Sequence, residues 1–258
     1  MQRYFIYFSY DGTDYHGWQY QPNAVSVQQR LEEALSLILN EKVSVVGAGR
    51  TDAGVHARMM VAHYDTDNGL DREKLAFKLN CLLPQDIAVH KIIPVSPDAH
   101  ARFSATSRMY HYYVTLSKTP FHSRYATRLY YALDFDRMNE AAALLLNYTD
   151  FGCFCKAHAD NKTNICHVSS ARWYKQKEGL YYFEIRADRF LRNMVRAIVG
   201  TLLEVGRGKI SVSQFEEIIQ SGKRSCAGDS VPAQGLFLED IVYPQDILQE
   251  ELQTKIFR

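Results

Sequence analysis

The chain has 258 residues, of which 47% are hydrophobic and 23% charged, and its formal net charge is +1. This composition is typical of a globular protein with one large domain or two small ones, and it excludes a largely disordered chain. No apolar run approaches the roughly 18 residues of a membrane span, and the first residues lack a signal-peptide layout, so we expect a cytoplasmic protein.

The first half of the chain shows the pattern of four strands and two helices. Strands are predicted over 3–10, 42–46, 59–64 and 87–95, where aromatic and β-branched residues concentrate. Ser26 opens a helix with Gln29 placed for a capping box and apolar residues at helical spacing up to Ile38. A second, short helix is predicted over 71–79. The order is β-α-β-β-α-β.

The second half repeats this order after a linker at 96–98. Strands are predicted over 109–116, 168–176, 180–187 and 236–242, and helices over 136–146, 190–204 and 213–219. The helix over 190–204 is expected to be strongly amphipathic. The repeated order predicts an α+β fold with two ferredoxin-like (βαββαβ) halves, residues 1–98 and 99–258, forming a mostly antiparallel sheet with flanking helices.

Positive charge is unevenly distributed along the chain. The stretch from Ala99 to Leu133 contains no Asp or Glu, but it contains basic residues interleaved with Tyr and Phe. A second stretch from Arg186 to Lys209 is also mainly basic. Clustered cations with aromatic residues suit RNA, because they neutralise phosphates and stack on bases. The alternative is a solvated face on which basic residues cluster by chance.

The stretch from Gly47 to Ala57 is the most unusual in the chain. It begins like a dinucleotide-binding fingerprint, but Asp52 stands where the third glycine belongs, and its carboxylate would repel a pyrophosphate. Glycines let the backbone approach a ligand closely, and Asp52 lies between small residues that leave its carboxylate accessible. The alternative is an Asx turn between two strands with Arg50 on the surface.

Five segments, in order, resemble the tRNA pseudouridine synthase A (TruA) family across nearly the whole chain. The central segment is Gly49-Arg50-Thr51-Asp52-Ala53-Gly54-Val55-His56-Ala57, which matches the family's catalytic loop without departure. The others are Tyr10-Asp11-Gly12-Thr13 with Gly17-Trp18-Gln19, His100 to Ala105 with Arg108 to Tyr112, Phe190 to Gly200, and Gly235 to Leu238. The resemblance implies the pseudouridine synthase fold and the isomerisation of uridine to pseudouridine at tRNA positions 38, 39 and 40.

The resemblance also implies roles for individual residues. Asp52 would be the nucleophile, and Arg196 would pair with Asp52 and keep it ionised. Tyr110 would stack on the target uracil, Arg50 would act as wedge or phosphate anchor, and Leu236 would pack beside the base. Without the resemblance, Arg196 is a surface helix residue, and Tyr110 and Leu236 are core residues.

Further expectations concern partners. Four arginines, Arg58, Arg102, Arg108 and Arg192, would contact tRNA phosphates, although each alone is an ordinary surface residue. The family works as a homodimer, and the reaction needs no cofactor and no metal. Alternatives are a pseudouridine synthase with other RNA targets and a catalytically silent RNA-binding module.

A zinc site is the remaining alternative. Cys153, Cys155, His158, Cys166 and His167 lie close in sequence, but they lack the paired C-x-x-C spacing of structural zinc sites. We expect no metal there. The odd total of five cysteines favours reduced thiols over a disulfide framework.

Overall fold

The computed structural model describes residues 1–69, 71–156 and 162–248, and the chain forms two compact units. Unit 1 comprises Met1–Thr106 and the chain from Leu238 onward, whereas unit 2 comprises Ser107–Phe237. These bounds differ from a division at residue 98. The last strand, although part of the second sequence half, belongs mostly to unit 1.

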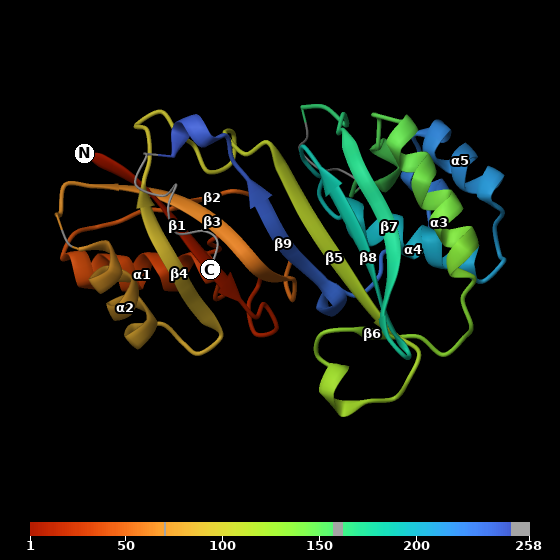
Figure 1. Ribbon diagram of the computed structural model, residues 1–258, viewed down its shortest axis with the longest axis horizontal. Coiled ribbons are helices and arrows are strands. Elements are labelled where there is room, and N and C mark those ends of the chain that lie inside the picture. Colours follow the sequence, from red (N-terminus) through yellow and green to blue (C-terminus); the bar gives the residue numbers. More distant parts are fainter. Residues whose placement is uncertain (70, 157–161, 249–258) are drawn as a thin grey trace. The chain divides into compact units, whose positions relative to one another are not determined.

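Unit 1 is an antiparallel sheet with two helices (Figure 1). Its elements are β1 (Gln2–Tyr10), α1 (Val27–Leu39), β2 (Val46–Gly47), β3 (His56–Thr66), α2 (Arg72–Leu82), β4 (Ile87–Pro94) and most of β9 (Leu236–Val242). The strand order is β4-β1-β3-β9, and β2 also pairs with β3. β1 lies antiparallel to both β3 and β4. The β-α-β-β-α-β order predicted for the first 98 residues is confirmed.

Unit 2 contains mainly antiparallel strands with three α-helices among its described residues (Figure 1). Its elements are β5 (Ser107–Thr115), β6 (Thr127–Arg128), α3 (Phe135–Leu144), β7 (Val168–Lys177), β8 (Leu180–Ala187), α4 (Met194–Gly206) and α5 (Val212–Ser221). The strand order is β5-β8-β7. The short strand β6 runs parallel to β5. α3 packs on α4, α5 and β7.

The helix caps follow the sequence signals in part. The Ser26 side chain accepts a hydrogen bond from the Gln29 backbone, as predicted for the start of α1. The reciprocal half of that capping box is not formed among the described residues, and the Gln29 side chain donates to Glu33. A complete capping box, formed by Ser211 and Gln214, starts α5.

The strand predicted over 42–46 is wrong for most of its length. Only Val46–Gly47 forms a strand. Upstream, the Val43 backbone N–H donates to the Ser36 side chain, and the Val45 N–H donates to the Glu32 carboxylate. These donors are therefore satisfied by side chains of α1 rather than by a neighbouring strand.

The helix predicted over 190–204 is wrong in its start and in its character. α4 begins at Met194, because Asn193 has a left-handed backbone with φ +67°. Phe190 and Arg192 therefore precede the helix. Nearly every residue of α4 is buried, including Gly200 and Thr201, so the helix is a core helix rather than an amphipathic surface helix.

Each unit has its own apolar core. In unit 1 the largest fully buried side chains include Trp18, Tyr64 and Phe8, and in unit 2 they include Tyr112 and Phe183. Within the described ranges, no helix is both long and apolar enough to cross a membrane.

Candidate active site

The loop that carries Asp52 connects β2 to β3 in unit 1. Asp52 is partly exposed, and Ala53-Gly54 forms a turn beside it in which Gly54 has φ +77°. The Val55 N–H donates to the Asp52 carbonyl at 3.1 Å, so the turn closes directly over the residue. The carboxylate thus stands on a short, hydrogen-bonded turn and not on a long open loop.

Residues in β1 and directly after it form hydrogen bonds with this loop. Tyr10 Oη and Thr51 Oγ1 share a hydrogen bond of 2.8 Å. The Trp18 N–H donates to the Thr51 carbonyl, and the Gly54 N–H donates to the Tyr15 carbonyl, each at 3.3 Å. Residues on both sides of Asp52 are therefore tied to the segment that follows β1.

Two glycines make that contact possible. A Cβ at Gly12 would overlap the Val55 carbonyl oxygen, and a Cβ at Gly17 would overlap the Thr51 carbonyl oxygen. Gly17 also has φ +86°, a conformation that other residues adopt only with strain. The glycines at 12 and 17 thus allow backbone to lie against backbone on both sides of Asp52.

His56 supports the loop from inside. Its ring is 1% exposed, and its Nδ1 lies 3.0 Å from the Gly12 nitrogen and 2.9 Å from Asp11 Oδ1. One nitrogen cannot both accept from Gly12 and donate to Asp11. We assign it as the acceptor, because the Gly12 N–H carries a proton that cannot move. His56 is then a buried structural residue.

The arginines predicted in unit 1 are all at the surface. Arg50, two residues before Asp52, is exposed. Arg58, on β3, lies 3.5 Å from the Glu239 carboxylate. Arg102 is exposed, and its guanidinium lies 5.6 Å from the ring centre of the exposed Phe103. All three side chains are accessible to a phosphate backbone.

The remaining predicted residues lie in unit 2. Tyr110, on β5, is partly exposed and makes an edge-to-face contact with Phe190, with ring centroids 5.1 Å apart. Its neighbour Tyr112 is fully buried and donates to the Pro232 carbonyl at 2.8 Å. Of these two tyrosines on β5, Tyr110 is the one with a ring open to solvent.

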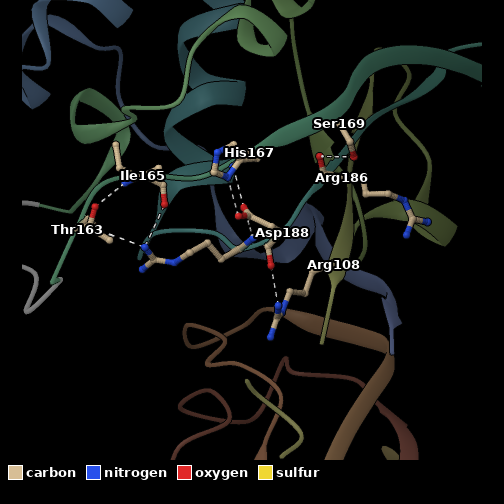
Figure 2. A network of polar contacts seen from close by, with 8 residues as sticks. Arg108, Thr163, Ile165, His167, Ser169, Arg186 and Asp188 are labelled. Atoms are coloured by element: carbon tan, nitrogen blue, oxygen red, sulfur yellow. Dashed lines mark hydrogen bonds and ion pairs between the residues drawn. The ribbon is translucent and has the colours of Figure 1, made fainter. Parts of the chain in front are cut away.

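Arg108, at the start of β5, belongs to a polar network (Figure 2). Its guanidinium donates to the Asp188 carbonyl at 2.7 Å. The Asp188 carboxylate accepts backbone N–H bonds from His167 and Arg189, and its other oxygen lies 2.9 Å from His167 Nδ1. Arg189 in turn donates to the Ile165 carbonyl. Asp188 thus joins the end of β8 to the segment before β7 and also orients Arg108.

Arg196 lies in the first turn of α4 and is held by the loop before β9. Its Nε donates to the Val231 carbonyl at 2.7 Å, and the Val231 N–H donates to the Arg196 carbonyl at 3.2 Å. Arg192 precedes the helix and is exposed. Leu236 opens β9 with 6% exposure, directly after Gly235, where a Cβ would lie 2.8 Å from the Tyr113 carbonyl oxygen.

The zinc alternative gains nothing from the described residues. Within those residues, no group of three or more His, Cys, Asp and Glu side chains is arranged to hold a metal ion. Cys153 and Cys166 are buried, and burial raises the pKa of each thiol to about 12, which disfavours the thiolate that binds metal. His158 lies outside the described residues.

The predicted residues thus fall into two sets. Arg50, Asp52, Arg58 and Arg102 belong to unit 1, and Arg108, Tyr110, Arg192, Arg196 and Leu236 belong to unit 2. Sequence reasoning missed the supports, namely Gly12, Gly17 and Tyr10 around the loop and Asp188 behind Arg108. The glycine-containing opening segment was a signal, but its spacing of more than 30 residues from the loop gave no reason to place the two together.

Comparisons with known proteins point to one family. The sequence profile of the family described as tRNA pseudouridine synthase matches residues 6–104 and 141–244. A tRNA pseudouridine synthase A from Bacteroides thetaiotaomicron is 57% identical over 258 residues, covering 99% of this chain and 96% of that protein. One from Acetivibrio thermocellus is 40% identical over 238 residues, covering 91% and 96%. The matched stretches include Asp52, Arg196 and Leu236, whereas Arg108 and Tyr110 lie between them.

Proposed function

The chain belongs to the tRNA pseudouridine synthase family, and from this premise we propose that Asp52 initiates the isomerisation of uridine at positions 38, 39 and 40 of the tRNA anticodon stem-loop. The enzyme is an isomerase that converts uridine to pseudouridine in tRNA. The observation that carries the role of Asp52 is its place on a turn clamped on both sides, where the carboxylate is partly exposed.

The reaction breaks the bond between ribose C1′ and uracil N1 and forms one between C1′ and C5. A proton leaves C5 and one is gained at N1, so no oxidant, reductant or cofactor is consumed. A carboxylate suits this sequence, because it can form a covalent adduct and then leave again. Attack on the sugar, attack on the uracil ring and assistance to an elimination all start from ionised Asp52.

Ionisation of Asp52 needs a cation once the base covers it, because desolvation favours the neutral acid. We assign this role to Arg196. Its Nε donates to the Val231 carbonyl, which fixes the direction of the guanidinium, and an arginine held in one direction suits a charge-assisted pair with a carboxylate. The pairing of Arg196 with Asp52 is part of the proposal.

Three further residues would hold the target nucleotide. Tyr110 would stack on the uracil, and Leu236 would pack beside it. Arg50 would fill the space that the extruded base leaves in the RNA, or it would anchor the phosphate of the extruded nucleotide. Flipping a base costs a few kcal/mol, and stacking on an aromatic ring returns about 1–3 kcal/mol. The exposed Arg50 and the partly exposed Tyr110 suit these roles.

Phosphate contacts would offset the remaining cost. Four arginines would make these phosphate contacts, namely Arg58, Arg102, Arg108 and Arg192. The proposal also includes a homodimer in the cytoplasm, in which one tRNA contacts both subunits. We also retain the division into ferredoxin-like halves at 1–98 and 99–258. The order β4-β1-β3 with β2 beside β3 supports it for the first half.

The test uses tRNA tritiated at uridine C5, from which turnover releases tritium. Asp52→Asn removes the nucleophile and retains the shape, so we expect tritium release to fall to background while tRNA binding persists. Asp14→Asn, an exposed aspartate in the same unit, is the matched control and should react as the wild type. Normal turnover by Asp52→Asn would refute the mechanism.

The alternatives give different results in the same assay. A silent RNA-binding module would bind tRNA without releasing tritium in the wild type. A synthase with other targets would release tritium, but it would leave positions 38, 39 and 40 unmodified when the product is mapped.

A further inference from the structure

The segment 117–131, between β5 and α3, projects an aromatic side chain among cations. Phe121 is 86% exposed on a short 3-10 turn, Pro120–His122, and Tyr130 is 80% exposed. Lys118 and Arg124, three residues before and three after Phe121 in the sequence, are exposed, and Asp and Glu are absent from the segment. The Arg128 guanidinium lies 4.6 Å from the Tyr130 ring centre, which holds that charge on an aromatic face.

The base of the segment is firmly anchored. Ala126 and Leu129 are buried, and Ala126 belongs to a core cluster with Tyr113, Leu180 and Phe237. The Leu129 N–H donates to the Thr115 carbonyl of β5 at 2.9 Å. Phe121 is therefore exposed on a projection whose base, at Ala126 and Leu129, is buried in unit 2.

The same anchors tie the segment to the proposed uridine-binding residues. Thr127 Oγ1 shares a hydrogen bond of 2.6 Å with Tyr112, two residues after Tyr110 on β5. Gln234, two residues before Leu236, donates to the Ser123 and Ala126 carbonyls at 3.3 and 3.4 Å. All these residues belong to unit 2, so the projection is held in register with Tyr110 and Leu236.

We propose that segment 117–131 is a second RNA-contacting surface, on which an unpaired base of the tRNA stacks on Phe121 while flanking phosphates meet Lys118 and Arg124. This inference rests on the proposed function and extends it, because the surface is separate from the residues assigned to the target uridine. Aromatic rings bind unpaired bases of any identity by stacking, and nearby Lys and Arg add sequence-independent affinity.

A second copy of this chain is the competing occupant, and the observations disfavour it. The exposed aromatic residues of the segment, Phe121, Tyr125 and Tyr130, are separated in sequence by polar and basic residues and form no continuous apolar run. A stable interface buries about 800 Å² on each partner, and Lys is depleted there relative to the rest of the surface. A symmetric contact here would also bring Lys118 and Arg124 against like charges.

The experiment measures binding of unmodified tRNA to the full-length enzyme and its steady-state turnover. Phe121→Ala should weaken binding by about fivefold or more, the lower bound for one stacked base. The loss should fall on KM rather than kcat, because the contact is made equally in the ground state and the transition state. Phe121→Trp should restore binding. Phe77→Ala, a 68% exposed phenylalanine on α2, is the matched control and should bind as the wild type.

The cationic part is tested by salt dependence. Lys118→Gln and Arg124→Gln should each reduce the slope of log affinity against log salt by about one. Unchanged affinity in Phe121→Ala with an active wild type overturns this inference alone, whereas an inactive wild type overturns the proposed function. A change of oligomeric state in Phe121→Ala, seen by sedimentation, would assign the surface to a second copy and also overturn the inference.

Discussion

Gly17 illustrates how a residue without a side chain sets the position of a carboxylate. Its backbone has φ +86° and lies against the Thr51 carbonyl, next to Asp52. A methyl group at position 17 would overlap the Thr51 carbonyl oxygen, and this backbone atom cannot move aside as a flexible side chain could. The loop that carries Asp52 must then shift or the left-handed conformation must be abandoned.

We therefore expect Gly17→Ala to lower both stability and turnover. The strained backbone alone costs on the order of 1–3 kcal/mol. For a chain of this size each kcal/mol lowers the melting temperature by roughly 2–4 °C. Thermal melting and tritium release measure the two effects. Gly69→Ala is the control, since a Cβ there meets nothing within 4 Å. An unchanged melting temperature and rate for Gly17→Ala would show that the loop is not held as described.

At the scale of elements, the turn after β8 depends on one carboxylate. Asp188 accepts N–H bonds from His167 and Arg189 while its carbonyl orients Arg108 (Figure 2). Burial opposes ionisation, but the hydrogen bonds outweigh it and hold the pKa of the Asp188 carboxyl below its ordinary value. A depressed pKa contributes stability above the unfolded pKa of about 4, and this contribution is lost as pH falls through the folded pKa.

Asp188→Asn should therefore lower the urea midpoint at pH 7, and the difference from the wild type should shrink below about pH 4. The expected cost is about 1 kcal/mol, because the carboxylate is partly open to solvent. Glu178→Gln is the control, since Glu178 forms a well-exposed ion pair with Lys175. A difference that does not change with pH would mean that the charge of Asp188 contributes nothing.

Elements were predictable where local chemistry decides them. The β7–β8 hairpin matches its predicted bounds closely, because a β-prone run on either side meets Gly179, whose φ is +72°. The start of α4 was missed because Asn193 adopts a left-handed conformation that helix periodicity does not reveal. The strand predicted over 42–46 was wrong for most of its length because Ser36 and Glu32, on the preceding helix α1, accept hydrogen bonds from its backbone N–H groups.

The candidate site was likewise predictable from the sequence only where local residues define it. The loop around Asp52 is recognisable in sequence, because its residues are consecutive and unusual. The contacts of Gly12 and Gly17 with that loop join segments more than 30 residues apart. Such long-range contacts depend on how β1 and β3 pair, and no local pattern contains that information.

At the scale of the whole molecule, the end of the described chain completes the unit in which the chain began. The Thr106 N–H donates to the Val242 carbonyl at 2.8 Å, and Tyr243 Oη donates to the Ala101 carbonyl at 2.6 Å. Leu238, Ile241 and Tyr243 are all buried in unit 1. At about 1.5–3 kcal/mol for each buried side chain, they contribute as much as the net stability of many domains.

A chain that ends at Phe237 should therefore lose the fold of unit 1 and retain that of unit 2. Each unit holds one of the two tryptophans, Trp18 at 2% and Trp173 at 3% exposure, so each has its own fluorescent reporter. With Trp173→Phe, shortening the chain should shift Trp18 emission to the red. With Trp18→Phe, the same truncation should leave Trp173 emission as in the full-length chain. Unshifted Trp18 emission would mean that residues 1–106 fold without the returning strand, because a buried indole is then still shielded from water.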